Sequence, residues 1–260
     1  MRGARLDSAS TPGTVLTRGK DESLHPVQSD LIAALRAELA HAADPAKAPA
    51  MQAYMKSAMP YRGVPAPQLR AACRLVFAAH PLASFEQWRA TTLALWRDAA
   101  YREERYAAID LTGEKRYRAY QRLDALPIYE EMIISGAWWD YVDELAIHRV
   151  GPLLARFPAP MGVTMLAWSR DANVWKRRTA ILCQNAFNAD TDEALLFACI
   201  EPNMSDREFF IRKAIGWALR EYAKTRPDAV RDFLRLHEAS LSPLSRREAA
   251  KHLTIPDPPS

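Results

Sequence analysis

The feature that most constrains the fold is the return of chemically distinctive side chains at a fixed interval within amphipathic segments. Between Trp139 and Arg178 there are 39 residue steps, and between Arg178 and Trp217 there are another 39. Repeats built of paired helices have periods of roughly 40 residues. The spacing therefore predicts that these three side chains occupy equivalent positions on successive helical repeats and line one surface.

The composition supports a helical chain. Only 9 of the 260 residues are Gly, 49% are hydrophobic, and runs rich in Ala, Leu, Arg and Glu dominate. The alternation of apolar and polar residues that marks strands is almost absent. We expect an all-α fold in which helix pairs, joined by short polar connections, stack into a curved solenoid with a concave surface.

The chain divides into one domain and two tails. Residues 1–28 show no periodicity and are rich in Ser, Thr, Pro and Gly, so we predict a disordered N-terminal tail. Residues 29–254 form the predicted helical-repeat domain, which starts with a helix capped by Ser29 or Asp30. Residues 255–260 contain three prolines and are predicted to be a flexible C-terminal tail.

Within the domain, the segment from Met59 to Pro67 is too rich in Pro and Gly for a helix, and we predict a loop there. A helix is expected near residues 117–123.

Charge and cysteine usage limit the class of function. The formal net charge is +4, which is compatible with a polyanionic partner. Cys73, Cys183 and Cys199 are widely separated and lie in apolar contexts, which is typical of reduced core residues in a cytosolic protein. The six histidines are scattered, so no metal site is predicted. No apolar run approaches the roughly 18 residues of a membrane span, and we predict a cytoplasmic protein.

The segment around Trp139 combines an aromatic ring with a carboxylate. On a helix, Trp139 and Asp143 lie one turn apart on the same face. Trp138, Val142 and Leu145 form a separate apolar stripe further round the helix. The segment can therefore bury the stripe and still present Trp139 together with Asp143.

Several of these residues have alternative interpretations. Asp143 is either a solvated helix residue, an ion-pair partner of Arg149 or Arg178, or a functional carboxylate. Arg178 adjoins two further cations and could be ordinary surface charge. Trp217 shares a helix face with Lys213, and a fully buried stripe does not normally carry a lysine. An exposed aromatic ring beside cations suits contact with a sugar or base next to a phosphate.

The basic pair Arg246 and Arg247 also allows two interpretations. It is either a solvated face or a phosphate clamp that follows a helix cap at Ser242 or Ser245. The cysteines lack a neighbouring base, and the chain contains no Gly-rich phosphate loop, so nucleophilic thiol chemistry and nucleotide binding by such a loop are not predicted.

Taken together, the motifs resemble those of the AlkD-like DNA alkylation repair glycosylases. The similarity runs in order from about residue 30 to residue 253. The segments that carry it are residues 51–63, 138–143, 175–181, 208–224 and 244–252.

The resemblance implies HEAT-like repeats that form a basic concave groove for duplex DNA. It also implies a monofunctional glycosylase that excises purines alkylated at N3 or N7, without a metal or cofactor, while the lesion stays stacked in the duplex. We expect such a protein to act as a monomer and to associate with the nucleoid when bound to DNA.

Individual residues inherit expected roles from the resemblance. Asp143 is similar to the catalytic aspartate of the family, Trp139 and Trp217 to the two tryptophans that contact the lesion-bearing deoxyribose, and Arg178 to the arginine beside it. We further predict DNA contacts from Tyr54, Arg177, Arg212, Lys213, Arg246 and Arg247. Pro65 replaces a polar residue that is frequent in the family, which departs from the pattern of the loop after residue 58.

The alternative is a binding module of the same architecture without catalytic activity, which recognises DNA structures or a protein partner. Fold alone does not decide between the two, because a solenoid can keep its groove and lose its chemistry. The presence of both Trp139 and Asp143 favours the enzyme.

Overall fold

The computed structural model describes residues 27–253, and within this range the chain is helical and contains no β-strand. The predicted all-α class is confirmed. The α-helices are α1 (Ser29–His41), α2 (Ala48–Met55), α3 (Ala66–Ala79), α4 (Phe85–Arg97), α5 (Arg102–Thr112), α6 (Leu126–Gly136), α7 (Trp139–Leu145), α8 (Gly151–Arg156), α9 (Pro158–Trp168), α10 (Val174–Leu182), α11 (Glu193–Ile200), α12 (Phe209–Ala223), α13 (Pro227–Leu236) and α14 (Pro243–Ala249). The tails predicted at residues 1–28 and 255–260 lie outside the described residues, except for Val27 and Gln28.

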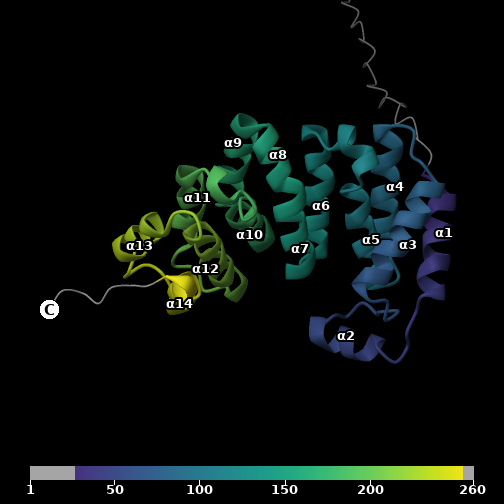
Figure 1. Cartoon of the computed structure of the whole chain (residues 1–260), viewed down its shortest axis with the longest axis horizontal. Helices are drawn as coiled ribbons and strands as arrows, with labels where there is room; N and C mark the ends of the chain where they lie inside the picture. Colours follow the sequence, from purple (N-terminus) through teal and green to yellow (C-terminus); the bar gives the residue numbers. More distant parts are fainter. Residues whose placement is uncertain (1–26, 254–260) are drawn as a thin grey trace, which may run out of the picture.

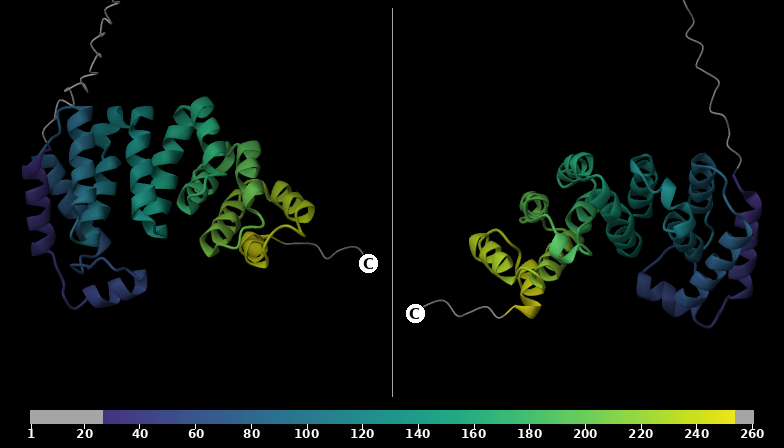
Figure 2. Two further views of the ribbon diagram at one scale, coloured as in Figure 1. Left: turned by 180° about the vertical axis from the view of Figure 1, so that it is seen from behind. Right: turned by 45° about the horizontal axis from the view of Figure 1, so that its top comes forward.

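Apart from α2, the helices follow one another along an elongated row from α1 at one end to α13 at the other, with α14 beside α12 (Figure 1). The same arrangement is seen from behind and with the top of the molecule tilted forward (Figure 2). Helix α1 packs on α3, α4 on α5, α6 on α7, α9 and α11 on α10, and α12 on α14. Each helix therefore buries its apolar face mainly against its neighbours in sequence, which is the architecture of a helical-repeat protein.

Helix α4 shows how the sequence specifies these elements. The hydroxyl of Ser84 accepts a hydrogen bond from the backbone N–H of Gln87 at 3.1 Å, which satisfies a free donor of the first turn. Trp88, Leu95 and Trp96 recur on one face of the helix and are almost fully buried. The cap fixes where the helix begins, and the apolar stripe fixes which side packs into the core.

The buried apolar side chains form two clusters that meet at α7 and α10. Val142 and Leu145 of α7 belong to the N-terminal cluster, whereas the next residue, Ala146, belongs to the C-terminal cluster. On α10, Ala180 joins the first cluster and Ile181 joins the second. Helix α10 therefore contributes to both halves of the core, and the boundary between the halves falls at the C-terminal end of α7.

Helix α7 continues through a π-helical segment, Ala146–Val150, into α8, so residues 139–156 form one unbroken helical run. A π segment shifts the register of the helix faces on its two sides. The run crosses the row: α7 lies toward the edge where α2 is found, and α8 lies at the opposite edge (Figure 1). At about 1.5 Å per residue, the run is about 25 Å long.

Helix α2 stands outside the row, and none of its residues is fully buried (Figure 1). The loop that follows it is nevertheless ordered, because the buried carboxylate of Glu103 accepts hydrogen bonds from the backbone N–H groups of residues 62–64 at 2.9 to 3.1 Å. Gly63 has φ = 83°, and a Cβ at this position would lie 2.0 Å from the carbonyl oxygen of Asp44. Glycine is therefore required at this turn.

One predicted helix is wrong. The segment near residues 117–123 forms two short 3-10 helices, Lys115–Tyr120 and Leu123–Ala125. The hydroxyl of Tyr117 accepts a hydrogen bond from the backbone N–H of Leu82 at 2.8 Å, and its backbone φ, ψ values leave the helical region. This tertiary contact outweighs the local helix propensity.

The predicted cap of the first helix is also wrong. Gln28 occupies the N-cap position of α1 and makes no capping hydrogen bond through its side chain. Ser29 and Asp30 lie inside the first turn, where the carboxylate of Asp30 favours the helix through the macrodipole instead. Among residues 27–253, every helix is too short or too polar to cross a lipid bilayer.

Candidate active site

The candidate site begins at the junction of α6 and α7. Helix α6 ends in a residue with left-handed backbone, Trp138 follows in an extended conformation, and Trp139 opens α7. Trp139 and Asp143 consequently lie one turn apart on α7, and both are partly exposed. Val142 and Leu145 are fully buried, as predicted, whereas Trp138 precedes the helix and is only partly buried.

Asp143 forms a bidentate ion pair with Arg178 of α10. The Nε and Nη2 atoms of the guanidinium donate to the two carboxylate oxygens at 2.7 and 2.8 Å. The side chain of Asp143 keeps 13% of its surface exposed, and that of Arg178 keeps 6%. Arg149, the other partner considered from the sequence, lies 3.4 Å from Glu144 instead. The pair fixes the orientation of the carboxylate and leaves part of it accessible.

The third guanidinium nitrogen of Arg178, Nη1, donates to the backbone carbonyl of Phe210 in α12. One side chain therefore ties together α7, α10 and α12. The ring of Phe210 packs against Trp138 and Trp175, with centroid distances of 5.5 and 5.0 Å. Because all three nitrogens donate within the protein, this geometry favours a positioning role for Arg178 over the phosphate contact predicted from the sequence.

Burial raises the pKa of Asp143 above its ordinary value, and the hydrogen bonds from Arg178 partly oppose this rise. The neighbouring carboxylate of Asp140 adds a further upward contribution, because like charges disfavour ionisation. The ionised carboxylate is thus poorly solvated at this position. A cation that reaches its exposed edge would be attracted more strongly than in water.

The two tryptophans of the predicted site lie on helices that are linked through α10. Helix α10 packs against both α7 and α12, so Trp139, Arg178 and Trp217 lie on three helices in series. Trp139 packs against the N-terminal cluster and Trp217 against the C-terminal cluster, and both remain half-buried. The indole N–H of Trp217 donates to Glu221 at 3.2 Å, which orients the ring. Both residues therefore keep part of their surface exposed.

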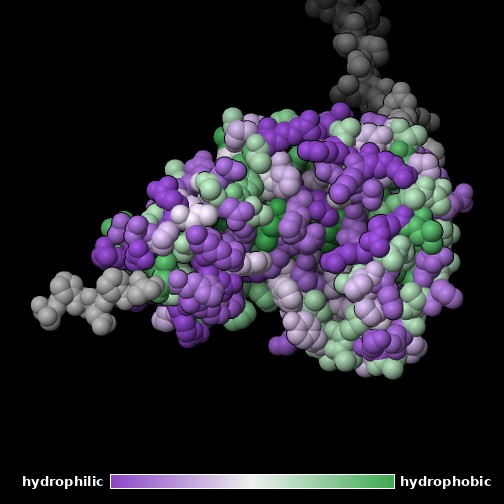
Figure 3. All heavy atoms as spheres, viewed as in Figure 1, coloured by the Kyte–Doolittle hydropathy of each residue, from purple (hydrophilic) through white to green (hydrophobic). Residues whose placement is uncertain are grey.

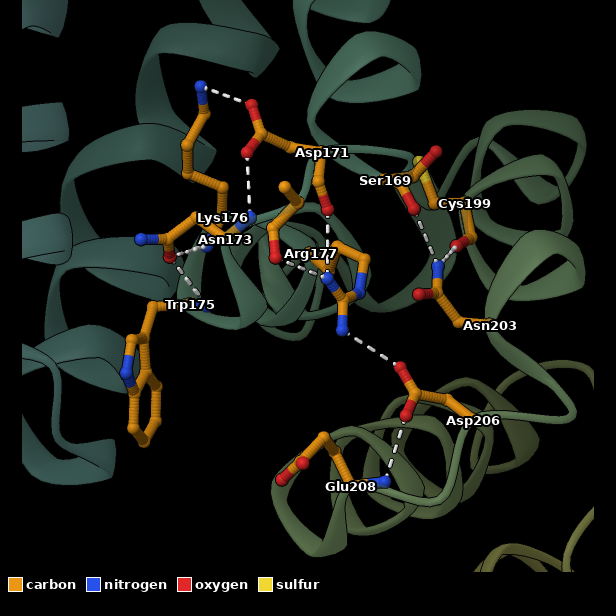
Figure 4. Close-up of polar contacts among 11 residues, drawn as sticks. Ser169, Asp171, Asn173, Trp175, Lys176, Arg177, Cys199, Asn203, Asp206 and Glu208 are labelled. Carbon is orange, nitrogen blue, oxygen red and sulfur yellow. Dashed lines mark hydrogen bonds and ion pairs between the residues drawn. The ribbon is translucent and has the colours of Figure 1, made fainter.

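Arg177 is held by a separate network that Figure 4 shows. Its Nη1 donates to two backbone carbonyls of the preceding loop, and its Nη2 donates to the carboxylate of Asp206 at 2.9 Å. Asn173 caps α10 by accepting backbone N–H bonds from the first turn at 2.9 and 3.3 Å. These contacts fix the start of α10, and therefore the position of Arg178. A DNA phosphate would have to compete with Asp206 for Arg177.

The remaining cations predicted to contact DNA fall into two groups. Lys213 and Arg246 each pair with a carboxylate, at 3.0 and 2.6 Å. Arg212 and Arg247 make no side-chain hydrogen bond or ion pair with any described residue, and the Nε of Arg212 is buried without a partner. Ser242 caps α14 by accepting the backbone N–H three residues later at 3.0 Å, which confirms one of the two predicted caps.

Tyr54, the predicted contact nearest the N-terminus, lies on α2 and is 75% exposed. The molecular surface is indented between the lobe that carries α2 and the lobe that carries α12 and α14 (Figure 3). Helix α7 lies at the edge of the row that faces this indentation (Figure 1). The phenol ring of Tyr54 is therefore accessible on the surface of the lobe that carries α2.

A buried ion pair that the sequence did not reveal lies beside the site. Asp140, which follows Trp139, accepts hydrogen bonds from Arg102 and from the hydroxyl of Tyr106, both at 2.6 Å. Arg102 also donates to Ser57, in the loop after α2, at 3.2 Å. Arg102 and Asp140 are 38 residues apart, close to the repeat interval. Opposite charges spaced by one repeat are a signal that could have identified this pair.

Two further features concern metal ligands and cysteine thiols. Within residues 27–253, no group of three or more His, Cys, Asp or Glu side chains could hold a metal ion. Cys73, Cys183 and Cys199 are buried and free, as predicted for reduced core residues. Burial raises the pKa of the Cys199 thiol to about 12, so this thiol is protonated at neutral pH and is a poor nucleophile.

Comparisons with known proteins agree on one family. The family model described as "DNA alkylation repair enzyme" matches residues 35–253. A solved structure described as "Predicted DNA alkylation repair enzyme from Enterococcus faecalis" is similar to this chain, with 31% sequence identity and a TM-score of 0.74. The similarity covers 81% of this chain and 96% of that one. A search of curated proteins finds no match.

Proposed function

The chain belongs to the family of DNA alkylation repair enzymes, and we propose that it is a monofunctional DNA glycosylase that excises N3- and N7-alkylated purines from duplex DNA. The observation that carries the proposal is the carboxylate of Asp143, which Arg178 holds in a fixed orientation beside Trp139. We propose that the protein acts in the cytoplasm as a monomer and needs no metal or cofactor.

The chemistry of the substrate explains why one carboxylate suffices. A purine alkylated at N3 or N7 carries a positive charge and leaves as a neutral base, so no general acid has to protonate it. The transition state places positive charge on the deoxyribose, as in glycoside hydrolysis. A negative group near the sugar stabilises this charge and can orient the attacking water.

Asp143 is suited to this task because it is oriented and poorly solvated. Its bidentate pair with Arg178 holds the carboxylate, and burial strengthens its interaction with a cation at the exposed edge. The faces of Trp139 and Trp217 would add cation–π stabilisation of about 0.5–2 kcal/mol each. Recognition through the sugar and backbone would let the lesion remain stacked, without the extrusion used by most glycosylases.

The test is release of free base from a duplex that contains N7-methylguanine. Asp143→Asn removes the charge but keeps the shape and one acceptor, and we expect it to lower the single-turnover rate by about 10²-fold. Duplex affinity should change little, because the carboxylate acts mainly in the transition state.

The matched control is Asp232→Asn, which removes the carboxylate partner of Arg235 on the exposed surface of α13, outside the network that positions Arg178. This variant should keep the wild-type rate. Equal rates for Asp143→Asn and the wild type would remove Asp143 from the mechanism.

A second candidate function is a binding module without catalysis. The burial of Asp143 in an ion pair favours it, because such a pair can be purely structural. The same assay separates the two functions, since a binding module would retain duplex affinity while releasing no base from N7-methylguanine or N3-methyladenine substrates.

A further inference from the structure

A polar cavity lies toward the end of the helical run 139–156 that carries α8. It has a volume of about 690 Å³ and lies between the 3-10 segment Lys115–Tyr120, α6, the π segment and α8. Its polar lining consists of Arg118, Gln121, Tyr129, His148, Arg149 and Arg156.

The position of this cavity separates it from Asp143. On the helical run 139–156, Asp143 precedes the lining residue His148 by 5 residues and Arg156 by 13, which corresponds to about 8 and about 20 Å along the axis. Helix α8 lies at the edge of the row opposite to α2 (Figure 1). A ligand in this cavity would therefore not occupy the surface on which Trp139 opens α7.

The charge of the cavity is of one sign. Three arginines and a histidine line it, and none of its lining residues is a carboxylate. Arg118 and Arg156 form no ion pair with any described residue, although Arg156 lies over the ring of Phe157 at 5.2 Å. Glu144 lies outside the lining and pairs with Arg149 at 3.4 Å and His148 at 3.8 Å, and Asp110, also outside the lining, interacts electrostatically with Arg149.

Arg149 is built rigidly into the wall. Its Nε donates to the hydroxyl of Thr112 at 2.7 Å, and its Nη2 donates to the backbone carbonyl of Ile109 at 3.1 Å. It thus contributes a fixed positive charge, while Arg118 and Arg156 are available to form new hydrogen bonds. Arginine is the side chain best suited to bind a phosphate through paired N–H donors.

Tyr129 adds a neutral donor with no partner. Its side chain is almost completely buried, at 1% exposure, and it lines the cavity, but its hydroxyl forms no hydrogen bond with any described residue. Burial raises the pKa of Tyr129 to about 12, so the hydroxyl keeps its proton at neutral pH. The hydroxyl oxygen is not among the fully buried atoms without a partner, so it reaches the accessible wall of the cavity and can donate a hydrogen bond to a ligand there.

We propose that this cavity is a second binding site, which takes a phosphate group. Arg118 and Arg156 would bind the phosphate oxygens through their guanidinium groups, and the hydroxyl of Tyr129 would donate a further, uncharged hydrogen bond. The volume falls within the range of small-molecule sites and exceeds the space that one phosphate needs. The phosphate belongs either to a small phosphorylated molecule or to the backbone of a DNA segment outside the active-site surface. Both sources share the same recognition chemistry.

The first experiment titrates the full-length protein with inorganic pyrophosphate by calorimetry at constant ionic strength. We expect saturable binding that weakens at least tenfold in the double variant Arg118→Gln/Arg156→Gln, because two charge-assisted contacts are lost. Tyr129→Phe should weaken it about fivefold by removing one hydrogen bond.

Arg89→Gln is the matched control, since Arg89 is also exposed and unpaired among the described residues but does not line this cavity. It should bind pyrophosphate like the wild type. If Arg89→Gln weakened pyrophosphate binding as much as the double variant does, the proposal would be overturned. It would also be overturned if the double variant bound both pyrophosphate and duplex DNA as tightly as the wild type.

A parallel titration with undamaged duplex DNA identifies the source of the phosphate. Loss of pyrophosphate binding with unchanged duplex affinity in the double variant supports a small phosphorylated ligand. Loss of duplex affinity, with a salt slope shallower by about 1.8, supports the DNA backbone. Neither outcome depends on whether the protein excises alkylated bases, so failure of the glycosylase proposal would be recognised separately.

Discussion

At the scale of single residues, Arg178 is the side chain on which the geometry of the carboxylate depends. It holds both oxygens of Asp143, and its third nitrogen binds a backbone carbonyl of α12. Arg178→Gln should lower the excision rate about 10²-fold, because a carboxylate displaced by about 1 Å loses its alignment with the sugar. The variant should also lose about 2–4 kcal/mol of unfolding free energy, since it leaves a buried charge unpaired. Single-turnover excision and urea unfolding measure the two effects.

The same variant distinguishes positioning from phosphate binding. If Arg178 only positions Asp143, the slope of log affinity against log salt for duplex DNA should not change. Arg177→Gln, the neighbouring arginine with its own partner, controls for loss of charge on α10. A slope shallower by about 0.9 in Arg178→Gln alone would restore the phosphate contact predicted from the sequence.

The raised pKa of Asp143 gives a predicted pH dependence. The active form is the carboxylate, and burial favours the protonated form. The excision rate should therefore be constant at high pH and fall as the pH decreases through a value above 3.9, the ordinary pKa of an aspartate. Single-turnover rates between about pH 4 and pH 8 test this. The residual excision rate of Asp143→Asn should not show this fall at low pH. The same fall in that variant would mean that another group titrates.

The sequence left two arginines, Arg149 and Arg178, as possible partners of Asp143. Helix geometry alone already disfavours Arg149. Arg149 is six residues further along the same helix, and six steps of about 100° place it on a different side. Arg178 is 35 residues away, close to one repeat, and equivalent helices of neighbouring repeats lie side by side. The bidentate geometry itself depends on the position of α10, which no local pattern encodes.

At the scale of elements, the contact between α12 and α14 sets the position of Trp217. Gly216, the preceding residue, faces α14 so closely that a Cβ would lie 2.4 Å from the Cβ of Glu248 and 2.9 Å from the carbonyl oxygen of Ser245. Gly216→Ala should push the two helices apart and lower the unfolding free energy by about 1–3 kcal/mol. Excision should fall as well, because α12 carries Trp217.

Gly162 provides the matched control for this substitution. It lies inside α9, and a Cβ there would have no neighbour within 4 Å. Gly162→Ala should raise the unfolding free energy by about 0.5–1 kcal/mol, because alanine restricts the unfolded chain and favours the helix. Urea unfolding of both variants is the measurement. Similar stability changes in the two proteins would contradict the close approach of α12 to α14.

Most helices could be predicted because their apolar periodicity agrees with their packing. The failure at residues 117–123 has a physical cause, since Tyr117 bonds to the backbone of a distant turn and stacks on Tyr120 with a centroid distance of 5.7 Å. The ion pair of Arg102 with Asp140 was missed for a related reason. Each partner alone resembles an ordinary surface charge, and only the packing of α5 against α7 makes the pair buried.

At the scale of the whole molecule, the order of the helices along the row follows from the repeat, because each unit buries its face against the next in sequence. The repeat does not determine which cations remain unpaired and can therefore bind a phosphate. The sequence shows Arg177, Lys213 and Arg246 as cations, but each is paired with a carboxylate in the folded protein. The net charge of +4 therefore says little about which cations can meet a phosphate.

This difference between paired and unpaired cations leads to a prediction for duplex binding. Arg212 and Arg247 have no partner among the described residues, so each can neutralise a phosphate without losing another contact. Arg212→Gln and Arg247→Gln should each reduce the slope of log affinity against log salt by about 0.9. Lys213→Gln and Arg246→Gln should reduce it less, since their charges are already offset by Glu248 and Glu238. Duplex affinity measured at four or more salt concentrations gives each slope. Equal reductions for all four variants would mean that DNA displaces the carboxylates, and that pairing in the free protein does not determine which cations bind.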